Sequence, residues 1–286
     1  MKKSLYLLIF ICTFLSAQNQ RFIYEYSFVA DSANKADVQK EMLVLDVNPE
    51  GSEFYSYEKF KSDSIVAGEL LKQSNSDSEI INVKEIYKGK IFYTVSKTYP
   101  KSEPFLFTAV GSDRYKVSDN RRMNWKILPE KQKAGEFETQ KAEMDMYGRK
   151  WTAWFATDIP IQDGPYKFHG LPGLIVKVED KSGSHSFELK GISRFAENNK
   201  AEVEAQLNSE KEIPINYAQY KKLILEEFND PTKSLRKLIS EAGANFKIFD
   251  SNGAEIKPAD MIRQRELKSK ENRKKNNNPL ELDLLK

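Results

Sequence analysis

The residue types that most often carry chemistry are scarce in this chain. Its two histidines, His169 and His185, lie sixteen residues apart, and neither an HxH nor an HExxH pair occurs. Zinc and iron sites need several nitrogen or sulfur ligands that converge on the metal. We therefore expect no metal site and no cofactor, and we interpret His169 as a loop residue whose ring is hydrogen-bonded to the backbone.

Catalysis by a nucleophile or by paired acids has little support in the sequence. No Gly-x-Ser-x-Gly elbow is present, and turn chemistry explains Ser182 and Ser184 beside His185. Asp158 and Asp163 could serve as a carboxylate pair, which keeps a hydrolase as one alternative. A solvated loop is the simpler interpretation, so the sequence assigns no catalytic residue and favours a non-enzymatic role.

An arginine and three aromatic residues give a stronger signal for binding. In the pattern from Arg149 to Phe155, Arg149 and Trp151 fall on one face of a strand and Trp154 on the other. A guanidinium and an indole on the same face can hold a ligand or a peptide by bidentate hydrogen bonds and stacking. The alternative is that Trp151 belongs to the core and Arg149 lies at its rim.

The stretch from Asp158 to Ile175 would complete this binding surface. It reads DIPIQDGPYKFHGLPGLI, and its three prolines and three glycines are typical of a shaped loop. Pro172 and Gly173 fit the second and third positions of a type II turn, which would give Gly173 a positive φ. A wide strand connection packed against Trp154 is the alternative. The candidate binding residues are Arg149, Trp151, Trp154, Asp163, Tyr166, His169, Gly170, Pro172 and Gly173.

Alternating apolar residues indicate the strands that position this loop. Residues 149–157 and 174–179 flank it, 186–195 forms a hairpin with the latter, and aromatic residues alternate over 21–29. Spacings of three and four predict helices after residue 216. We expect a mainly β (α+β) fold: an antiparallel meander forming a curved sheet or incomplete barrel, with a small C-terminal helical element and a disordered tail.

Composition divides the chain into three parts. Lys2 and Lys3, an apolar run and Ala17 form the pattern of a signal peptide over residues 1–17, which contains the single cysteine, Cys12. A single β-rich domain is expected over 18–250, with helices near 216–242. A polar, disordered tail is expected over 251–286. No mature segment is apolar enough to span a membrane, and 45 basic against 42 acidic residues leave no nucleic-acid footprint.

The loop also carries a family resemblance. Gly170 to Ile175 spells GLPGLI, and the sequence resembles the GLPGLI family of secreted Bacteroidetes-type proteins. Gly148 to Trp154, Ile159-Pro160 and Gly164-Pro165 are similar to that family as well, so the resemblance spans about residues 125–192. It implies secretion and carries no known activity.

Three functions remain open at this point. The first is a secreted cell-envelope protein, periplasmic, outer-membrane-associated or extracellular, that binds a ligand or an envelope partner without catalysis. The second is a carrier of an apolar ligand such as a lipid, held in a half-barrel cavity. The third is the hydrolase that uses carboxylates. The sequence predicts no oligomeric state.

Overall fold

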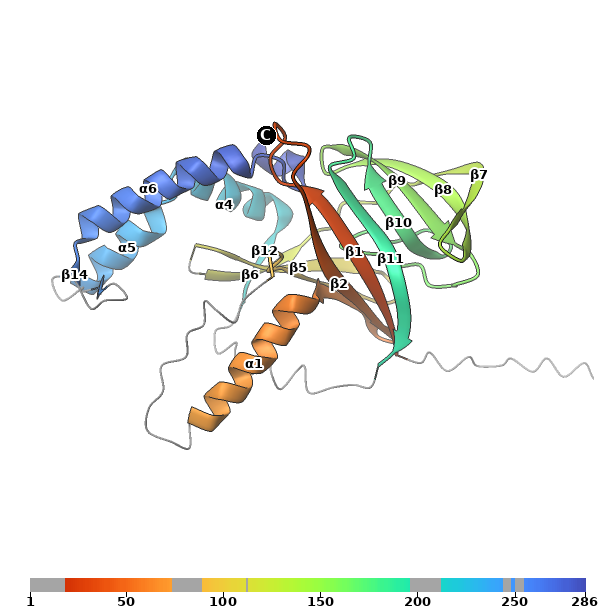
Figure 1. Cartoon of the computed structure of the whole chain (residues 1–286), viewed down its shortest axis with the longest axis horizontal. Helices are drawn as coiled ribbons and strands as arrows, with labels where there is room; N and C mark the ends of the chain where they lie inside the picture. The colour runs from red at the N-terminus through yellow and green to blue at the C-terminus, as the bar shows by residue number, and fades with distance from the viewer. Residues whose placement is uncertain (1–18, 74–88, 112, 196–211, 244–247, 250–254) are drawn as a thin grey trace, which may run out of the picture.

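The computed structural model describes residues 19–73, 89–111, 113–195, 212–243, 248–249 and 255–286. Within these residues, twelve strands form one curved sheet that does not close into a barrel (Figure 1). Its strands are β1 (Gln20–Val29), β2 (Val38–Asn48), β3 (Gly51–Ser56), β4 (Thr94–Thr98), β5 (Glu103–Val110), β6 (Asp113–Ser118), β7 (Lys126–Ala134), β8 (Phe137–Met146), β9 (Arg149–Ala156), β10 (Leu174–Asp180), β11 (His185–Arg194) and β12 (Ile213–Asn216). The mainly β fold that the sequence predicted is confirmed.

The sheet grows outward from β1, which lies between β2 and β11. In one direction the order runs through β2 to β6 and β12, and in the other it runs through β11 back to β7. All neighbouring pairs are antiparallel except β12 and β6, which are parallel. Most strands therefore pair with the next strand along the chain, as in a meander.

Alternation along the strands gives the sheet an apolar inner face. In β1, Phe22, Tyr24 and Tyr26 are buried at every second position, and in β9 Trp151 and Phe155 follow the same rule. Successive side chains of a strand point to opposite faces, so these rings all lie on the inner side. This face forms the core of the protein.

The connection between β9 and β10 fills that inner face. We call residues 157–173 the plug segment, because its Tyr166, Phe168 and Leu171 are buried in the core cluster. The Phe168 ring packs edge-on against Trp151, with 4.8 Å between ring centroids. The half-barrel cavity of the lipid-carrier hypothesis is therefore occupied by the protein's own side chains.

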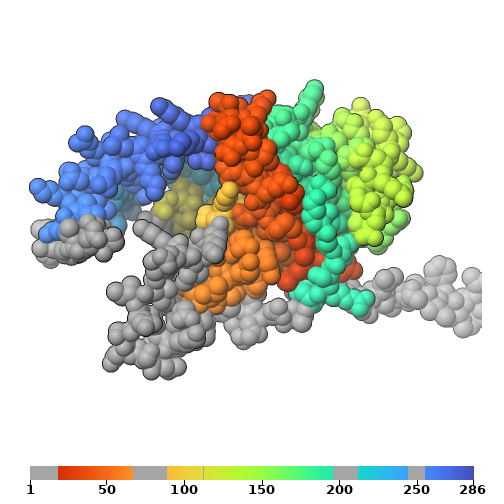
Figure 2. Space-filling model, viewed as in Figure 1, coloured from red at the N-terminus to blue at the C-terminus, as the bar shows by residue number. Residues whose placement is uncertain are grey.

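Helices lie beside the sheet, and one of them also contributes to the core through Tyr220. They are α1 (Tyr57–Gln73), α4 (Tyr217–Asn229), α5 (Lys233–Ala242), α6 (Pro258–Lys275) and the 3-10 turn η2 (Leu282–Leu285), with a small hairpin of β13 (Ile248–Phe249) and β14 (Glu255–Ile256). A capping box of Asn216 and Gln219 starts α4. Together α4, α5 and α6 form an arm that extends away from the sheet (Figures 1 and 2).

The C-terminal part differs from the expected disordered tail over residues 255–286. Helix α6 has no buried residue, which is why composition indicated disorder. Pro258 at its start and Arg273, Lys274 and Lys275 in its last turn suit the two ends of a helix. Beyond α6, residues 276–285 return to the sheet as the C-terminal segment, where Asn278 and Glu281 are buried.

One expectation falls on residues outside the described ranges, and another is tested within them. The signal peptide predicted over residues 1–17 lies outside the described residues. Among the residues that are described, no helix combines the length and apolar character needed to cross a membrane.

Candidate functional site

The predicted pair Arg149 and Trp151 shares one face of β9, but that face is the inner one. Only 7% of Arg149 and 1% of Trp151 is exposed. The Trp151 indole N–H donates to the carbonyl of Met146 at 3.0 Å. Arg149 and Trp151 therefore form no exposed surface, and Trp151 belongs to the core, as the alternative interpretation had it.

The C-terminal segment explains how a charged arginine can be buried there. The Arg149 guanidinium donates to Asp180 Oδ2 at 3.0 Å and to Asn278 Oδ1 at 2.6 Å. It also donates to the carbonyls of Pro279 and Leu280, at 2.6 and 3.0 Å. A buried cation needs a partner and satisfied hydrogen bonds, and this arginine has both. Four of its five N–H donors are thus bound within the protein, so Arg149 joins parts of the fold rather than presenting a surface to a ligand.

Asp163 anchors the plug segment to β4. Its carboxylate is fully buried and lies 2.5 Å from the Lys97 ammonium, and it accepts from the Tyr99 hydroxyl at 2.6 Å. The same ammonium donates to the carbonyls of Gly164 and Tyr166 at 2.8 and 2.9 Å. Burial lowers the pKa of Lys97, and the Asp163 carboxylate opposes that effect. Asp163 thus holds the plug in place and does not face a ligand.

Tyr166 and Lys167 join the plug to the C-terminal segment. Lys167 donates to Glu281 Oε1 at 2.6 Å and to Asp119 Oδ2 at 3.0 Å, and the Tyr166 hydroxyl donates to Glu281 Oε1 at 2.6 Å. Burial would raise the pKa of Asp119, but hydrogen bonds from Arg121 and the charge of Lys167 hold it at about 2. Both carboxylates are therefore neutralised by cations, which argues against acid catalysis here.

His169 and Gly170 follow the sequence prediction of a shaped loop in part. The His169 Nδ1–H donates to the carbonyl of Lys167 at 2.8 Å, so the ring is bonded to the backbone as expected. Burial lowers the pKa of His169, which keeps the ring neutral at pH 7. Gly170 has a φ of +88°, a backbone angle that favours glycine.

Gly173 is required for a different reason from the one predicted. The positive φ that a type II turn needs occurs at Gly170 and not at Gly173. Instead the Gly173 N–H donates to the carbonyl of Leu171 at 2.8 Å, a tighter turn around the exposed Pro172. A β-carbon on Gly173 would lie 2.2 Å from the carbonyl oxygen of Ala156. The type II turn is therefore wrong, and the close approach of Gly173 to the backbone at the end of β9 explains the glycine.

The other two tryptophans, Trp125 and Trp154, lie in different places. Trp154 is half-buried on the outer face of β9, opposite Trp151, and so is not part of one surface with it. Trp125, which the sequence did not single out, donates its indole N–H to the carbonyl of His169 at 2.9 Å. Its ring lies 6.1 Å from Phe168, so it braces the plug from the side of β7.

The beginning of the plug, residues 158–162, is accessible and lines a large hollow. We call this hollow the end cleft, because it lies where β1 begins and β2 and β11 end. It has a volume of about 730 Å³, within the usual range for ligand pockets. Its lining residues are Gln20, Phe22, Val47, Asn48, Tyr99, Pro100, Ser102, Asp158, Ile159, Pro160, Ile161, Gln162 and Ile192.

Backbone hydrogen bonds hold the plug residues that form one wall of the end cleft. The Leu174 N–H donates to the carbonyl of Ile159 at 3.0 Å, and the Ile161 N–H donates to the same carbonyl at 2.7 Å. Ile192 on β11 keeps 45% of its surface exposed. The cleft is thus apolar and preformed, and Asp158 is the single charged residue of its lining.

The chemistry available to this cleft is limited. Asp158 is exposed at the rim, whereas Asp163 is buried against Lys97, so the two carboxylates proposed for hydrolysis are in different surroundings. Within the described ranges, no group of three or more His, Cys, Asp or Glu residues is arranged to hold a metal ion. The cleft can bind an apolar group, and no described residue offers it a nucleophile with an adjacent base.

The described chain is an open, curved β-sheet with a filled inner face and an apolar end cleft. Residues 107–177 match a family model described as a protein of unknown function, Porph_ging. This corrects the resemblance to the GLPGLI family: the hexapeptide lies inside the matched range, and the family whose model matches there is Porph_ging. The matched range covers less than half of the chain.

Solved structures of PNGF-II, in two space groups, are similar to this chain at 16% identity. The TM-scores are 0.48 and 0.49, and each alignment covers 72% of this chain but 32% and 33% of the solved one. This chain therefore spans about a third of the length of those structures. No curated protein matches the chain.

Proposed function

We propose that this chain is a non-enzymatic binding protein that holds an apolar group in the end cleft. The observation that carries the proposal is the lining, in which eight of thirteen residues are apolar or aromatic. Ligand pockets of this kind are mostly apolar, with a few polar groups that fix orientation. Gln20, Gln162 and Asp158 at the rim supply those polar groups.

The charge of the lining limits the types of ligand that the cleft can bind. Asp158 has no ion pair among the described residues, so the cleft carries one free negative charge. A neutral or cationic apolar ligand fits this charge better than a fatty acid, whose carboxylate would lie near another carboxylate. The lipid-carrier hypothesis is thus retained in a changed form, with the ligand at the end of the sheet rather than on its inner face.

The test is titration of the protein with N-phenyl-1-naphthylamine, an apolar dye whose fluorescence rises when it leaves water. Ile192→Lys places a charged side chain at the cleft wall and should weaken dye binding by about tenfold or more. Ile127→Lys is the matched control, because Ile127 is 47% exposed on β7 and lines no part of the cleft. Equal affinities for the two variants would overturn the proposal.

We also propose that the protein is exported across the inner membrane to the cell envelope or the exterior. The support is in the sequence alone: Lys2 and Lys3, the short apolar run and Ala17. Intact-mass measurement of the protein recovered from cells should give a chain that starts at Gln18 without lipid. A diacylated Cys12 at the N-terminus would contradict this.

A further inference from the structure

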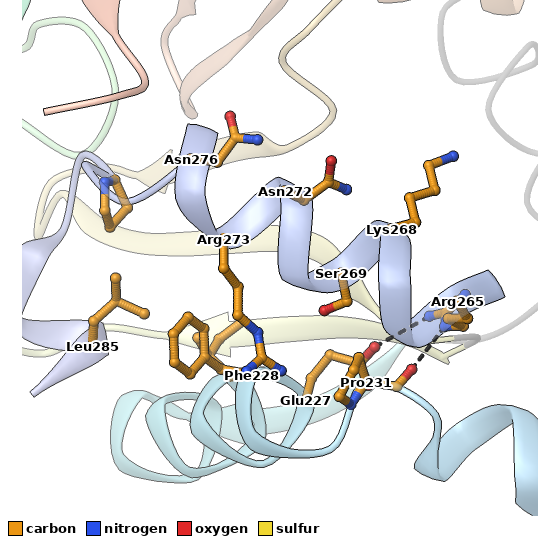
Figure 3. Close-up of a pocket in the computed structure, with 12 residues that line it drawn as sticks. Glu227, Phe228, Pro231, Arg265, Lys268, Ser269, Asn272, Arg273, Asn276 and Leu285 are labelled. Atoms are coloured by element: carbon orange, nitrogen blue, oxygen red, sulfur yellow. Dashed lines mark hydrogen bonds and ion pairs between the residues drawn. The ribbon is translucent and has the colours of Figure 1, made fainter. Parts of the chain in front are cut away.

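A second hollow lies in the helical arm, between α4 and α6 (Figure 3). We call it the helix groove, and its volume is about 480 Å³. It is lined by Ile224, Glu227, Phe228, Pro231, Arg265, Lys268, Ser269, Asn272, Arg273, Asn276, Pro279 and Leu285. It shares no lining residue with the end cleft.

The floor of the helix groove is apolar. Ile224 and Phe228 come from α4, and Pro279 and Leu285 come from the C-terminal segment. Phe228 keeps 39% of its surface exposed, although large aromatic side chains gain most from burial. The groove therefore offers apolar contact that the described chain leaves unused.

Arg273 stands over this floor with its charge unpaired. Its guanidinium carbon lies 4.5 Å from the centre of the Phe228 ring, a cation–π contact. Its Nε is buried and has no hydrogen-bond partner, and no carboxylate among the described residues forms an ion pair with it. The guanidinium therefore carries a charge that no described carboxylate balances, which favours an anionic partner.

The other two cations of the groove differ in whether a carboxylate of the described chain pairs with them. Arg265 donates to Glu227 Oε1 at 3.2 Å and to the carbonyl of Pro231 at 2.7 Å (Figure 3), so this pair is neutral. Lys268 has no ion pair among the described residues. Arg273 and Lys268 therefore leave the groove with a positive charge of two, which favours an anionic ligand.

Spacing along α6 favours an extended ligand over a compact one. Lys268, Asn272 and Asn276 are four residues apart and so lie on one side of the helix. Their polar ends form a row of about 12 Å, since each residue advances the helix by about 1.5 Å. The side chains of Asn272 and Asn276 make no hydrogen bond within the described chain. In Figure 3 the side chains of all three residues project from the side of α6 away from Phe228, so they form the outer rim of the groove rather than its floor. A rim of this kind can donate to carbonyl oxygens of an extended peptide that lies along it.

We propose that the helix groove binds an extended peptide segment of a partner protein in which acidic and apolar residues alternate. A carboxylate of the peptide would accept from Arg273, its backbone carbonyls would accept from the amides of Asn272 and Asn276, and an apolar side chain would cover Phe228. Alternate side chains of an extended peptide point to opposite sides, so one face would carry the acids and the other the apolar groups.

The test uses the full chain and a fluorescein-labelled hexapeptide, Glu-Leu-Glu-Leu-Glu-Leu, followed by fluorescence anisotropy. Arg273→Gln should weaken binding by about tenfold or more, because it removes the charge and keeps much of the length. Arg263→Gln is the matched control: Arg263 is exposed on the same helix and lines no part of the groove. It should change binding by less than about twofold.

Two further binding experiments test which type of ligand the groove prefers. The peptide Lys-Leu-Lys-Leu-Lys-Leu should not bind, and vesicles of phosphatidylglycerol should not compete with the acidic peptide. Because α6 has no buried residue, thermal unfolding of Arg273→Gln should match that of the parent chain, which separates lost binding from lost folding. Equal loss in both arginine variants, no binding of the acidic peptide, or competition by the vesicles would overturn the proposal.

Discussion

The end cleft and the helix groove are both apolar hollows, but their walls are built in opposite ways. The end cleft rests on a plug segment that is held to the sheet by buried ion pairs such as Lys97 with Asp163. The helix groove rests on helices whose side chains are mostly exposed, and Tyr220 is the single buried residue within α4, α5 and α6. The wall of the end cleft is continuous with the core, whereas the helix groove lies in helices attached to the edge of the sheet.

Their charges are opposite as well. Asp158 gives the end cleft a free negative charge, whereas Lys268 and Arg273 give the helix groove two free positive charges. Two ligands of unlike chemistry could therefore occupy one chain without competing. The difference indicates that mutations at the end cleft should act on folding as well as binding, while mutations at the helix groove should act on binding alone.

The largest effect should follow from removing the lysine beneath the plug. Lys97→Met leaves Asp163 buried without its cation, and breaking a buried ion pair costs about 3–5 kcal/mol. The free energy of unfolding from urea titration should fall by that amount. Lys268→Met, the matching change in the helix groove, should change it by less than about 0.5 kcal/mol. Similar losses in both variants would remove the distinction between the two regions.

The second effect is acid sensitivity of the sheet. His185 accepts from the Tyr26 hydroxyl through Nδ1 and donates through Nε2 to the carbonyl of Asn278, so it is buried in its neutral form. Burial and the positive charge of Arg149 lower the pKa of His185 from 6.5 to about 4, although the negative charge of Asp180 opposes them.

The sign of this effect follows from proton binding. An unfolded chain takes up the proton near pH 6.5 and the folded chain does so near pH 4, so stability is full above pH 6.5 and falls as the pH drops toward 4. The loss over that window should reach roughly 3 kcal/mol. Unfolding measured across the window should be flatter in His185→Gln, and an unchanged slope would show that another group titrates.

A smaller pair of effects separates two glycines of the plug. Gly173→Ala should cost about 1–3 kcal/mol, because its β-carbon meets the backbone of Ala156. Gly170→Ala should cost about 1 kcal/mol, because its φ is +88° but the space around it is open. Melting temperatures of the two variants test this order, and the reverse order would restore a turn-based role for Gly173.

The smallest effect is salt dependence. Raising the salt concentration from about 0.05 to 0.5 M should weaken binding of the acidic peptide to the helix groove several-fold, because exposed charges are screened. Binding of the neutral dye to the end cleft should hardly change over the same range. Parallel titrations of both probes measure the difference, and an equal salt response would mean that charge does not distinguish the hollows.

Local pattern was enough to predict much of the fold but not the direction in which the site faces. Alternation placed Arg149 and Trp151 on one face of a strand, and the structure agrees. Whether that face is inside depends on Asn278 and Pro279, whose contacts with Arg149 span 129 and 130 residues. No periodicity within a strand contains that information. The backbone bond of His169 was predictable because its partner, Lys167, is only two residues away.

Contacts between residues far apart in the sequence also explain the errors at Gly173 and in the tail. A Pro-Gly pair is a reliable local signal for a turn, but the contact that requires Gly173 comes from the end of β9. Composition marked residues 251–286 as polar, yet Glu281 is buried because its partners, Tyr166 and Lys167, are cationic or hydroxyl groups inside the core. The beginning of the plug lines the end cleft, but the sequence pattern distinguishes it in no way from the rest of the loop over 158–175.

The contacts of the C-terminal segment also set an order of events during synthesis. Lys167 leaves the ribosome 114 residues before Glu281, and Arg149 leaves it 129 residues before Asn278. Until those partners emerge, closing the sheet over the plug would bury cations without their full set of acceptors, which is unfavourable. We expect the nascent chain to stay open, and sensitive to protease on stalled ribosomes, until residues 278–281 have emerged. A protein that passes through a translocation channel unfolded would gain from such a delay.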